Sequence, residues 1–273
     1  MADATLTHGT AGSVQHGLSG EFEAPFFGAY SKKVGMWLFL ASDSLTFGAL
    51  LVAFSYNRIY TTPWPTPFHV ASITNATIMT ACLLSSSLTM VMGVFAAQRG
   101  DRVWTRNWLL ATMAFGTAFI VLHGMEWSKL IDEGLTIPWF LKLGAGASTG
   151  ELADVSKNTP QFSATFFSLT AMHMLHVTIG VIYLGVVAFR KWFLAALAAI
   201  WIGGALLIPS SNVFHYPIHA LGIALVVAAI ILFLKPKDYD AQDVEVAGLY
   251  WHFVDLVWMF IFPLVYLMST KIV

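Results

Sequence analysis

Long apolar stretches separated by short polar ones dominate the pattern of this 273-residue chain. An uninterrupted apolar run of about 17–25 residues is long enough to cross a bilayer as a helix. The pattern therefore predicts an all-α integral membrane protein, a bundle of about seven transmembrane helices. The predicted spans lie at about 34–57, 70–97, 107–131, 161–189, 192–209, 215–235 and 248–270.

The fifth and sixth spans differ from the rest. The fifth is short and ends at Pro209, and only the stretch PSSN separates it from the sixth. Together they predict a tight helical hairpin at about 192–235, either two full spans or a re-entrant pair. Both choices leave the last helix in the same orientation.

The first 30 residues are polar and rich in Gly, Ser and Thr. They lack the charged segment followed by an apolar segment of a signal peptide. We expect residues 1–30 to be a polar cytoplasmic N-terminal arm, and 31–273 to be a transmembrane helical domain.

The distribution of Lys and Arg favours an N-terminus in the cytoplasm and a C-terminus outside. Cytoplasmic loops carry an excess of these residues. With this orientation the inner side holds nine of the 14, namely Lys32, Lys33, Arg99, Arg102, Arg106, Arg190, Lys191, Lys235 and Lys237.

Composition narrows the class further. Charged residues make up 11% of the chain, against about 25% in ordinary globular domains, because most of the surface faces lipid. A net charge of −1 lacks the excess of positive charge that is typical of nucleic-acid-binding proteins. The single cysteine, Cys82, excludes a disulfide framework within the chain and any Cys-based zinc or iron–sulfur site built from this chain alone.

Three acidic residues interrupt apolar stretches, where a carboxylate is costly and usually faces a bundle interior or a partner. For Asp43, a proton-relay or lipid-contacting role and a protonated carboxyl bonded to a neighbouring helix are equally open. Glu126 beside Trp127 favours an interfacial anchor. Asp255 lies three residues after His252, which favours an internal His–Asp hydrogen bond over docking to another subunit.

Five histidines lie in or near predicted helices. Facing histidines can ligate haem or a metal, but intramembrane histidines also form hydrogen bonds between helices. Spacing alone favours the structural interpretation over ligation. The five are His123, His173, His176, His219 and His252.

Five segments resemble, in the same order, helices of cytochrome c oxidase subunit III of the haem-copper oxidase family. The first four are GMWLFLASDSLTFGALLVAF, ITNATIMTACLLSSSLTM, GTAFIVLHGMEW and FFSLTAMHMLHVTIG. The most specific is EVAGLYWHFVDLVWMFIFPLVYL, which is similar to the closing pattern Y-W-H-F-V-D-x-V-W. The segment at 192–235 has no recognised counterpart in the pattern.

The resemblance implies a non-catalytic subunit of a proton-pumping cytochrome c oxidase, the terminal enzyme that reduces dioxygen to water in aerobic respiration. Such a subunit has no catalytic, cofactor-binding or metal-binding residues of its own, because haem and copper lie in partner subunits. It packs on subunit I in a complex that includes subunit II, binds structural phospholipids and supports proton uptake. We expect a bacterial inner membrane rather than a mitochondrial one, and the arm and hairpin leave room for a larger respiratory supercomplex.

The matching positions give two groups of site residues. Those expected to support proton uptake or the lipid cleft are Asp43, His173, His176, Glu126 and Trp127. Those expected in subunit or lipid packing are Asn75, Trp251, His252, Asp255 and Trp258. Asp43 stands where the family has Glu, His123 where Gln is common, and Trp127 where Tyr is common.

Other functions remain as alternatives. One is the related accessory subunit of a nitric-oxide reductase. The others are a stand-alone membrane haem cytochrome and a proton-coupled transporter. The electron donor of the oxidase, cytochrome c or quinol, is left open by the sequence.

Overall fold

A computed structural model describes most of the membrane domain. It covers residues 31–62, 64–68, 70–135, 158–189 and 240–269, together with residues 155, 196, 201, 222–224, 226, 227, 230 and 231. The N-terminal arm and most of the predicted hairpin at 192–235 lie outside the described residues.

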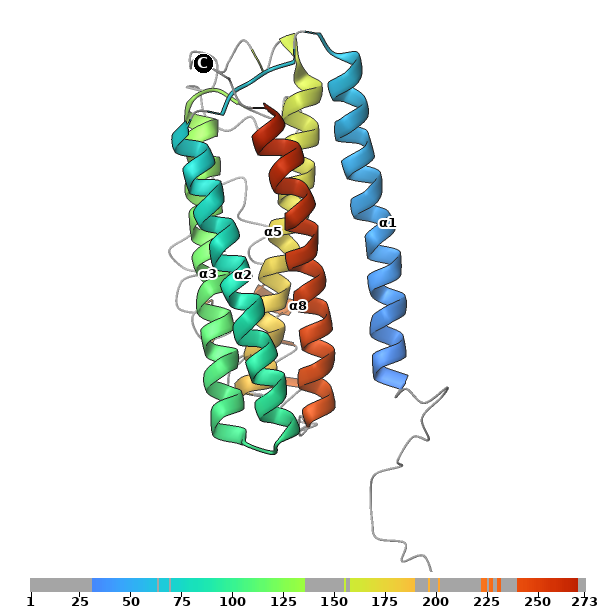
Figure 1. The fold of residues 1–273 in the computed structure, drawn as a ribbon, viewed down its shortest axis with the longest axis vertical. Helices are drawn as coiled ribbons and strands as arrows, with labels where there is room; N and C mark the ends of the chain where they lie inside the picture. Colours follow the sequence, from blue (N-terminus) through green and yellow to red (C-terminus); the bar gives the residue numbers. More distant parts are fainter. Residues whose placement is uncertain are drawn as a thin grey trace, which may run out of the picture.

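Five long helices form the described part (Figure 1). Each is long and apolar enough to cross a membrane, which confirms five of the seven predicted spans as helices. The helices are α1 (Ser31–Tyr60), α2 (Val70–Gln98), α3 (Arg102–Asp132), α5 (Pro160–Phe189) and α8 (Ala241–Ile261). The last continues through a π-helix at Phe262–Tyr266, which contains Pro263, into a 3-10 turn at Leu267–Ser269.

Two helices begin several residues before the apolar stretches that predicted them. The carboxylate of Asp101 accepts a hydrogen bond from the Trp104 amide and caps α3. Asp240 and Asp243 form a reciprocal capping box at the start of α8. Such caps bond the otherwise unpaired amides of the first turn, so the helices extend into polar sequence that the hydrophobicity criterion leaves out.

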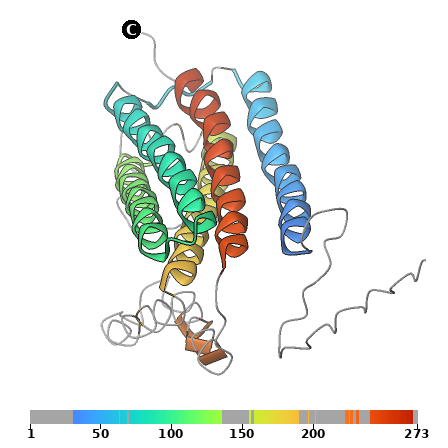
Figure 2. The same ribbon diagram turned by 60° about the horizontal axis from the view of Figure 1, so that its bottom comes forward.

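Four helices, α2, α3, α5 and α8, pack together, while α1 lies to one side against α5 and α8 (Figure 1). Figure 2 shows the same separation from another direction. Helix α5 ends at the end of the bundle where α8 begins. The intervening chain therefore starts and finishes on one side, as both versions of the predicted hairpin require.

Glycine closes the short α2–α3 connection. Gly100 has a φ of +77°, a left-handed conformation that favours glycine. Its amide donates to Ala97, and the Asp101 amide donates to Ala96, the two bonds of a Schellman motif. Asp101 thus ends one helix and caps the next, which forces α2 and α3 into an antiparallel hairpin.

Ion pairs hold the first turn of α1 against the first turn of α8. Lys32 Nζ lies 3.0 Å from Asp243 Oδ1, and Lys33 pairs with Glu245. Asp243 is 5% exposed. Because a charge in such a place needs a partner, these pairs help to fix where α1 stands.

The indole of Trp251 on α8 fills the centre of the four-helix group. Its Nε1 donates to Ser86 Oγ on α2 at 2.9 Å. A Cβ added at Gly116 of α3 would lie 2.5 Å from the ring, and one added at Gly180 of α5 would lie 2.9 Å away. The absence of side chains at these two positions therefore lets three helices close around one tryptophan.

We predict that Gly116→Ala lowers the thermal stability of the purified chain, because overpacking costs about 1–3 kcal/mol. Gly124→Ala is the matched control on the same helix, since nothing lies within 4 Å of its added Cβ. Alanine is a better helix former than glycine, so the control should hold or raise stability by about 0.5–1 kcal/mol. Equal unfolding midpoints for the two variants would contradict the tight fit at Trp251.

Candidate functional site

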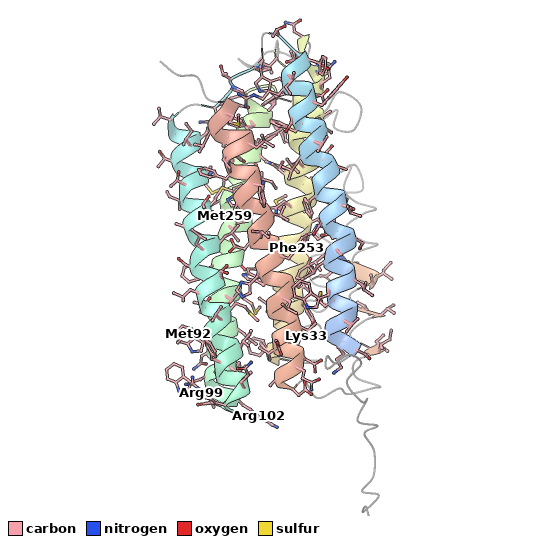
Figure 3. The ribbon with its side chains drawn as sticks, turned by 45° about the vertical axis from the view of Figure 1, so that its right-hand side comes forward. Lys33, Met92, Arg99, Arg102, Phe253 and Met259 are labelled. Atoms are coloured by element: carbon pink, nitrogen blue, oxygen red, sulfur yellow. The ribbon has the colours of Figure 1, made fainter. Side chains whose placement is uncertain are left out.

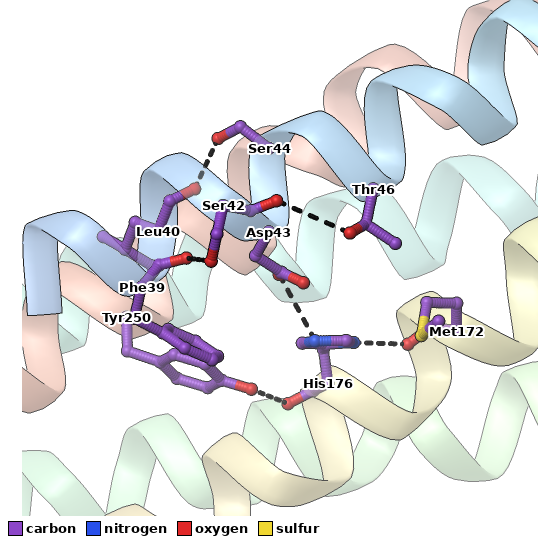
Figure 4. Close-up of polar contacts among 9 residues, drawn as sticks. All are labelled: Phe39, Leu40, Ser42, Asp43, Ser44, Thr46, Met172, His176 and Tyr250. Atoms are coloured by element: carbon purple, nitrogen blue, oxygen red, sulfur yellow. Dashed lines mark hydrogen bonds and ion pairs between the residues drawn. The ribbon is translucent and has the colours of Figure 1, made fainter.

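Asp43 of α1 and His176 of α5 face each other inside the apolar region (Figure 4). The Asp43 Oδ2 and His176 Nε2 atoms are 3.3 Å apart, and the side chains are 11% and 10% exposed. The contact has the distance of an ion pair but not the angles of a good hydrogen bond. It joins α1 to the four-helix group.

The other ring nitrogen of His176 fixes the proton arrangement. Nδ1 lies 2.7 Å from the backbone oxygen of Met172, which can only accept a hydrogen bond. Nδ1 therefore carries a proton. The nitrogen that faces the Asp43 carboxyl is therefore Nε2.

Neighbouring side chains hold this pair in place through packing and through hydrogen bonds to backbone oxygens. The Tyr250 hydroxyl donates to the backbone oxygen of His176 at 3.1 Å. The Phe47 ring meets the imidazole edge-on, with centroids 5.1 Å apart. Ser42 and Ser44, which flank the carboxylate in sequence, instead bond to backbone oxygens of their own helix (Figure 4).

His173 and His123 are held differently. Both are fully buried, and neither imidazole has a hydrogen-bond partner among the described residues. His173 stacks on Trp258 with centroids 5.2 Å apart, and His123 stacks on Phe119 at 5.6 Å. Hydrogen bonding between helices, which the structural interpretation expected, is thus seen for His252 with Ser87 of α2. It is not seen for His173 and His123, whose rings pack as aromatic groups. His219 lies outside the described residues.

Glu126 is inside the bundle, so its prediction as an interfacial anchor was wrong. Its side chain is 5% exposed, and Oε2 accepts hydrogen bonds from Asn75 Nδ2 and from the Tyr266 hydroxyl, each at 3.4 Å. Tyr266 belongs to the π-helix that follows α8. The rotation of α3 places the carboxylate between helices and not at the lipid boundary.

Trp127, next to Glu126, packs within the protein as well. Its ring meets Phe167 of α5 edge-on, with centroids 5.2 Å apart. It also lies 5.6 Å from His123. Trp127 therefore helps to cover the buried polar group that precedes it.

The predicted direct bond between His252 and Asp255 is absent. Ser87 of α2 takes the place of Asp255 as the partner of His252, with its hydroxyl 2.7 Å from His252 Nδ1. His252 and Asp255 share a face of α8, as predicted, but that face points at Ser87 of α2.

Trp251 and Trp258, expected in subunit or lipid packing, are at most 1% exposed within this chain. The indole of Trp258 donates to Thr80 of α2 at 2.9 Å. Both tryptophans thus donate to hydroxyl groups of α2. The run SSSLT at 85–89 contains the first of these partners, Ser86, and was its available signal in the sequence.

A metal site needs several ligand side chains close together. Within the described ranges, no three His, Cys, Asp or Glu side chains gather in a way that could hold a metal ion. The polar groups of the site instead form pairs: Asp43 with His176, Glu126 with Asn75 and Tyr266, and Ser87 with His252.

No protein-family model matches the chain. Cytochrome c oxidase subunit 3 of Alkalihalophilus pseudofirmus is 27% identical to it over 240 residues, 88% of each chain. Cytochrome c oxidase subunit 3 of Thermostichus vulcanus is 27% identical over 272 residues, 98% of this chain and 99% of the relative.

Cytochrome bo(3) ubiquinol oxidase subunit 3 of Pseudomonas aeruginosa is 26% identical over 236 residues, 86% of this chain and 84% of the relative. The chain is thus similar both to subunits named for cytochrome c oxidases and to a subunit named for a ubiquinol oxidase. The resemblance to subunit III of haem-copper oxidases, predicted from five segments, is therefore confirmed over most of the chain.

Proposed function

We propose that this chain is subunit III of a proton-pumping haem-copper terminal oxidase. The observation that carries the proposal is its similarity, over most of both chains, to curated proteins named as subunit 3 of such oxidases. The five segments that resemble the family fold as five neighbouring helices of one bundle, which is consistent with that role.

In this proposal the chain carries no redox centre and performs no catalytic step. It packs on the subunit I that holds haem and copper, in a bacterial inner membrane, with its N-terminus in the cytoplasm and about seven spans in all. Exposed apolar residues on α1, among them Trp37, Leu38 and Leu45, suit contact with lipid or with that subunit.

Asp43 and His176 are the proposed support for proton uptake. They form the one buried carboxylate–imidazole pair among the described residues. A carboxylate beside an imidazole inside a membrane is the kind of pair used in proton relays. Glu126 and His173 lie deeper in the bundle, where they support the packing of helices around the pair.

We predict that affinity-tagged chain, purified in mild detergent, brings with it a haem- and copper-bearing subunit that consumes oxygen. An optical spectrum, identification of the co-purified proteins and an oxygen electrode are the measurements. Supplying cytochrome c in one assay and a quinol in another would identify the electron donor.

The same preparation separates the alternatives. Haem bands in a chain that purifies alone would indicate a cytochrome, and a colourless solitary chain would indicate a transporter. Co-purification with nitric-oxide reductase activity and no oxygen consumption would indicate the other accessory subunit. Each of these outcomes contradicts the oxidase proposal.

We predict that Asp43→Asn leaves assembly and the first turnovers intact but shortens the active life of the oxidase under continuous turnover. The amide fits the same space beside His176 Nε2, but it cannot take up and release a proton. Progress curves of oxygen consumption and of proton uptake would measure the effect.

Ser44→Ala is the matched control for this variant. It removes a neighbouring polar group whose hydroxyl bonds only to its own helix. Proton uptake and durability that are the same in Asp43→Asn, Ser44→Ala and the unchanged protein would exclude a role for the pair in proton supply.

A further inference from the structure

A cavity of about 370 Å³ opens where α2 and α5 end and where α3 and α8 begin. Its described lining comes from these four helices, and none comes from α1. It is therefore separate from the Asp43–His176 pair, which lies between α1 and α5. Its volume falls in the range of ligand pockets in general, about 300–1,000 Å³.

Two arginines line one side of this cavity. Arg102 and Arg106 are four residues apart, one turn of α3, so they lie on the same helix face. Neither forms an ion pair with a carboxylate in the described part of the chain. By contrast, Lys32 and Lys33 at the same end of the bundle are both paired. Figure 3 shows Arg102 at this end, with Arg99 and Lys33.

A negative charge lines the opposite side. Asp240 caps α8, and its Oδ1 accepts the amide hydrogen bond of Asp243. The cavity thus offers two guanidinium groups from one helix and one carboxylate from another. Guanidinium groups match the geometry of a phosphate, whereas a carboxylate favours an ammonium group. A group that carries both charges satisfies both sides.

The tryptophans of α3 near the cavity indicate the depth of lipid headgroups. Trp104, which is 56% exposed, and Trp108 lie on the same turns of α3 as the arginines, with ring centroids 6.2 Å apart. Exposed tryptophans concentrate at the membrane–water interface. The lining also includes the apolar side chains of Leu109, Val187 and Val244. Charged groups at the rim over an apolar wall suit a lipid better than a free phosphate compound.

We propose that this cavity binds the headgroup of a zwitterionic aminophospholipid such as phosphatidylethanolamine. Arg102 and Arg106 hold the phosphate, Asp240 holds the ammonium, and the acyl chains leave over the apolar lining. All of these residues belong to one chain, so the site does not depend on the proposed oxidase function.

The test compares lipid retention by the full chain, purified in mild detergent with whatever subunits accompany it. Native mass spectrometry counts bound phospholipids, and lipid extraction identifies them. Arg102→Gln combined with Arg106→Gln should lower phosphatidylethanolamine occupancy about tenfold or more, because charge-assisted hydrogen bonds are lost. Arg99→Gln is the matched control, since it removes a cation from the same end but not from this cavity.

Asp240→Asn tests the ammonium side without removing the helix cap, because asparagine caps helices as well as aspartate does. In detergent micelles doped with phosphatidylethanolamine or phosphatidylglycerol, the variant should lose its preference for the former. Binding of inorganic phosphate that displaces no lipid would assign the arginines to a soluble phosphate compound and overturn the proposal. Equal lipid retention by all variants, or equal loss in Arg99→Gln, would also overturn it, as would an unchanged headgroup preference in Asp240→Asn.

Discussion

The insertion of Trp251 between two glycines is the contact on which the packing of the four-helix group depends. In a membrane, lipid tails are as apolar as leucine, so helices associate through close packing and hydrogen bonds rather than through the hydrophobic effect. The ring supplies both: it fills the space left by Gly116 and Gly180, and its N–H bonds to Ser86. One residue of α8 thereby touches α2, α3 and α5.

This packing sets the positions of the polar groups. With α8 fixed, Trp258 reaches Thr80, and Ser87 falls beside His252. Tyr250, the neighbour of Trp251, bonds to the backbone of His176 on α5. The imidazole that faces Asp43 is thus held by the same helix that closes the bundle, which couples the proposed proton-holding pair to the fold.

Helix α1 depends on polar contacts at two levels. Lys32 and Lys33 tie its first turn to α8, and Asp43 meets His176 about three turns further on. Much of its remaining surface is apolar and exposed. An accessory subunit of an oxidase needs such a surface for lipid or for a larger partner. The cavity at Arg102 and Asp240 lies away from this surface, so the proposed lipid site is separate from it.

The sequence by itself determined the five described helices, because a bilayer requires long apolar runs. It also determined the resemblance, because the motifs of α1, α5 and α8 are specific. It did not determine which face of each helix points inward. Apolar residues surround these helices on all sides, so periodicity gives little sign of the interior. For this reason Glu126 was expected at an interface and lies in the bundle, and His252 was expected to bond to Asp255 and meets Ser87. Only the tertiary structure brought Asp43 to His176, 133 residues later in the chain, because that pairing depends on the rotation of two helices set by distant packing.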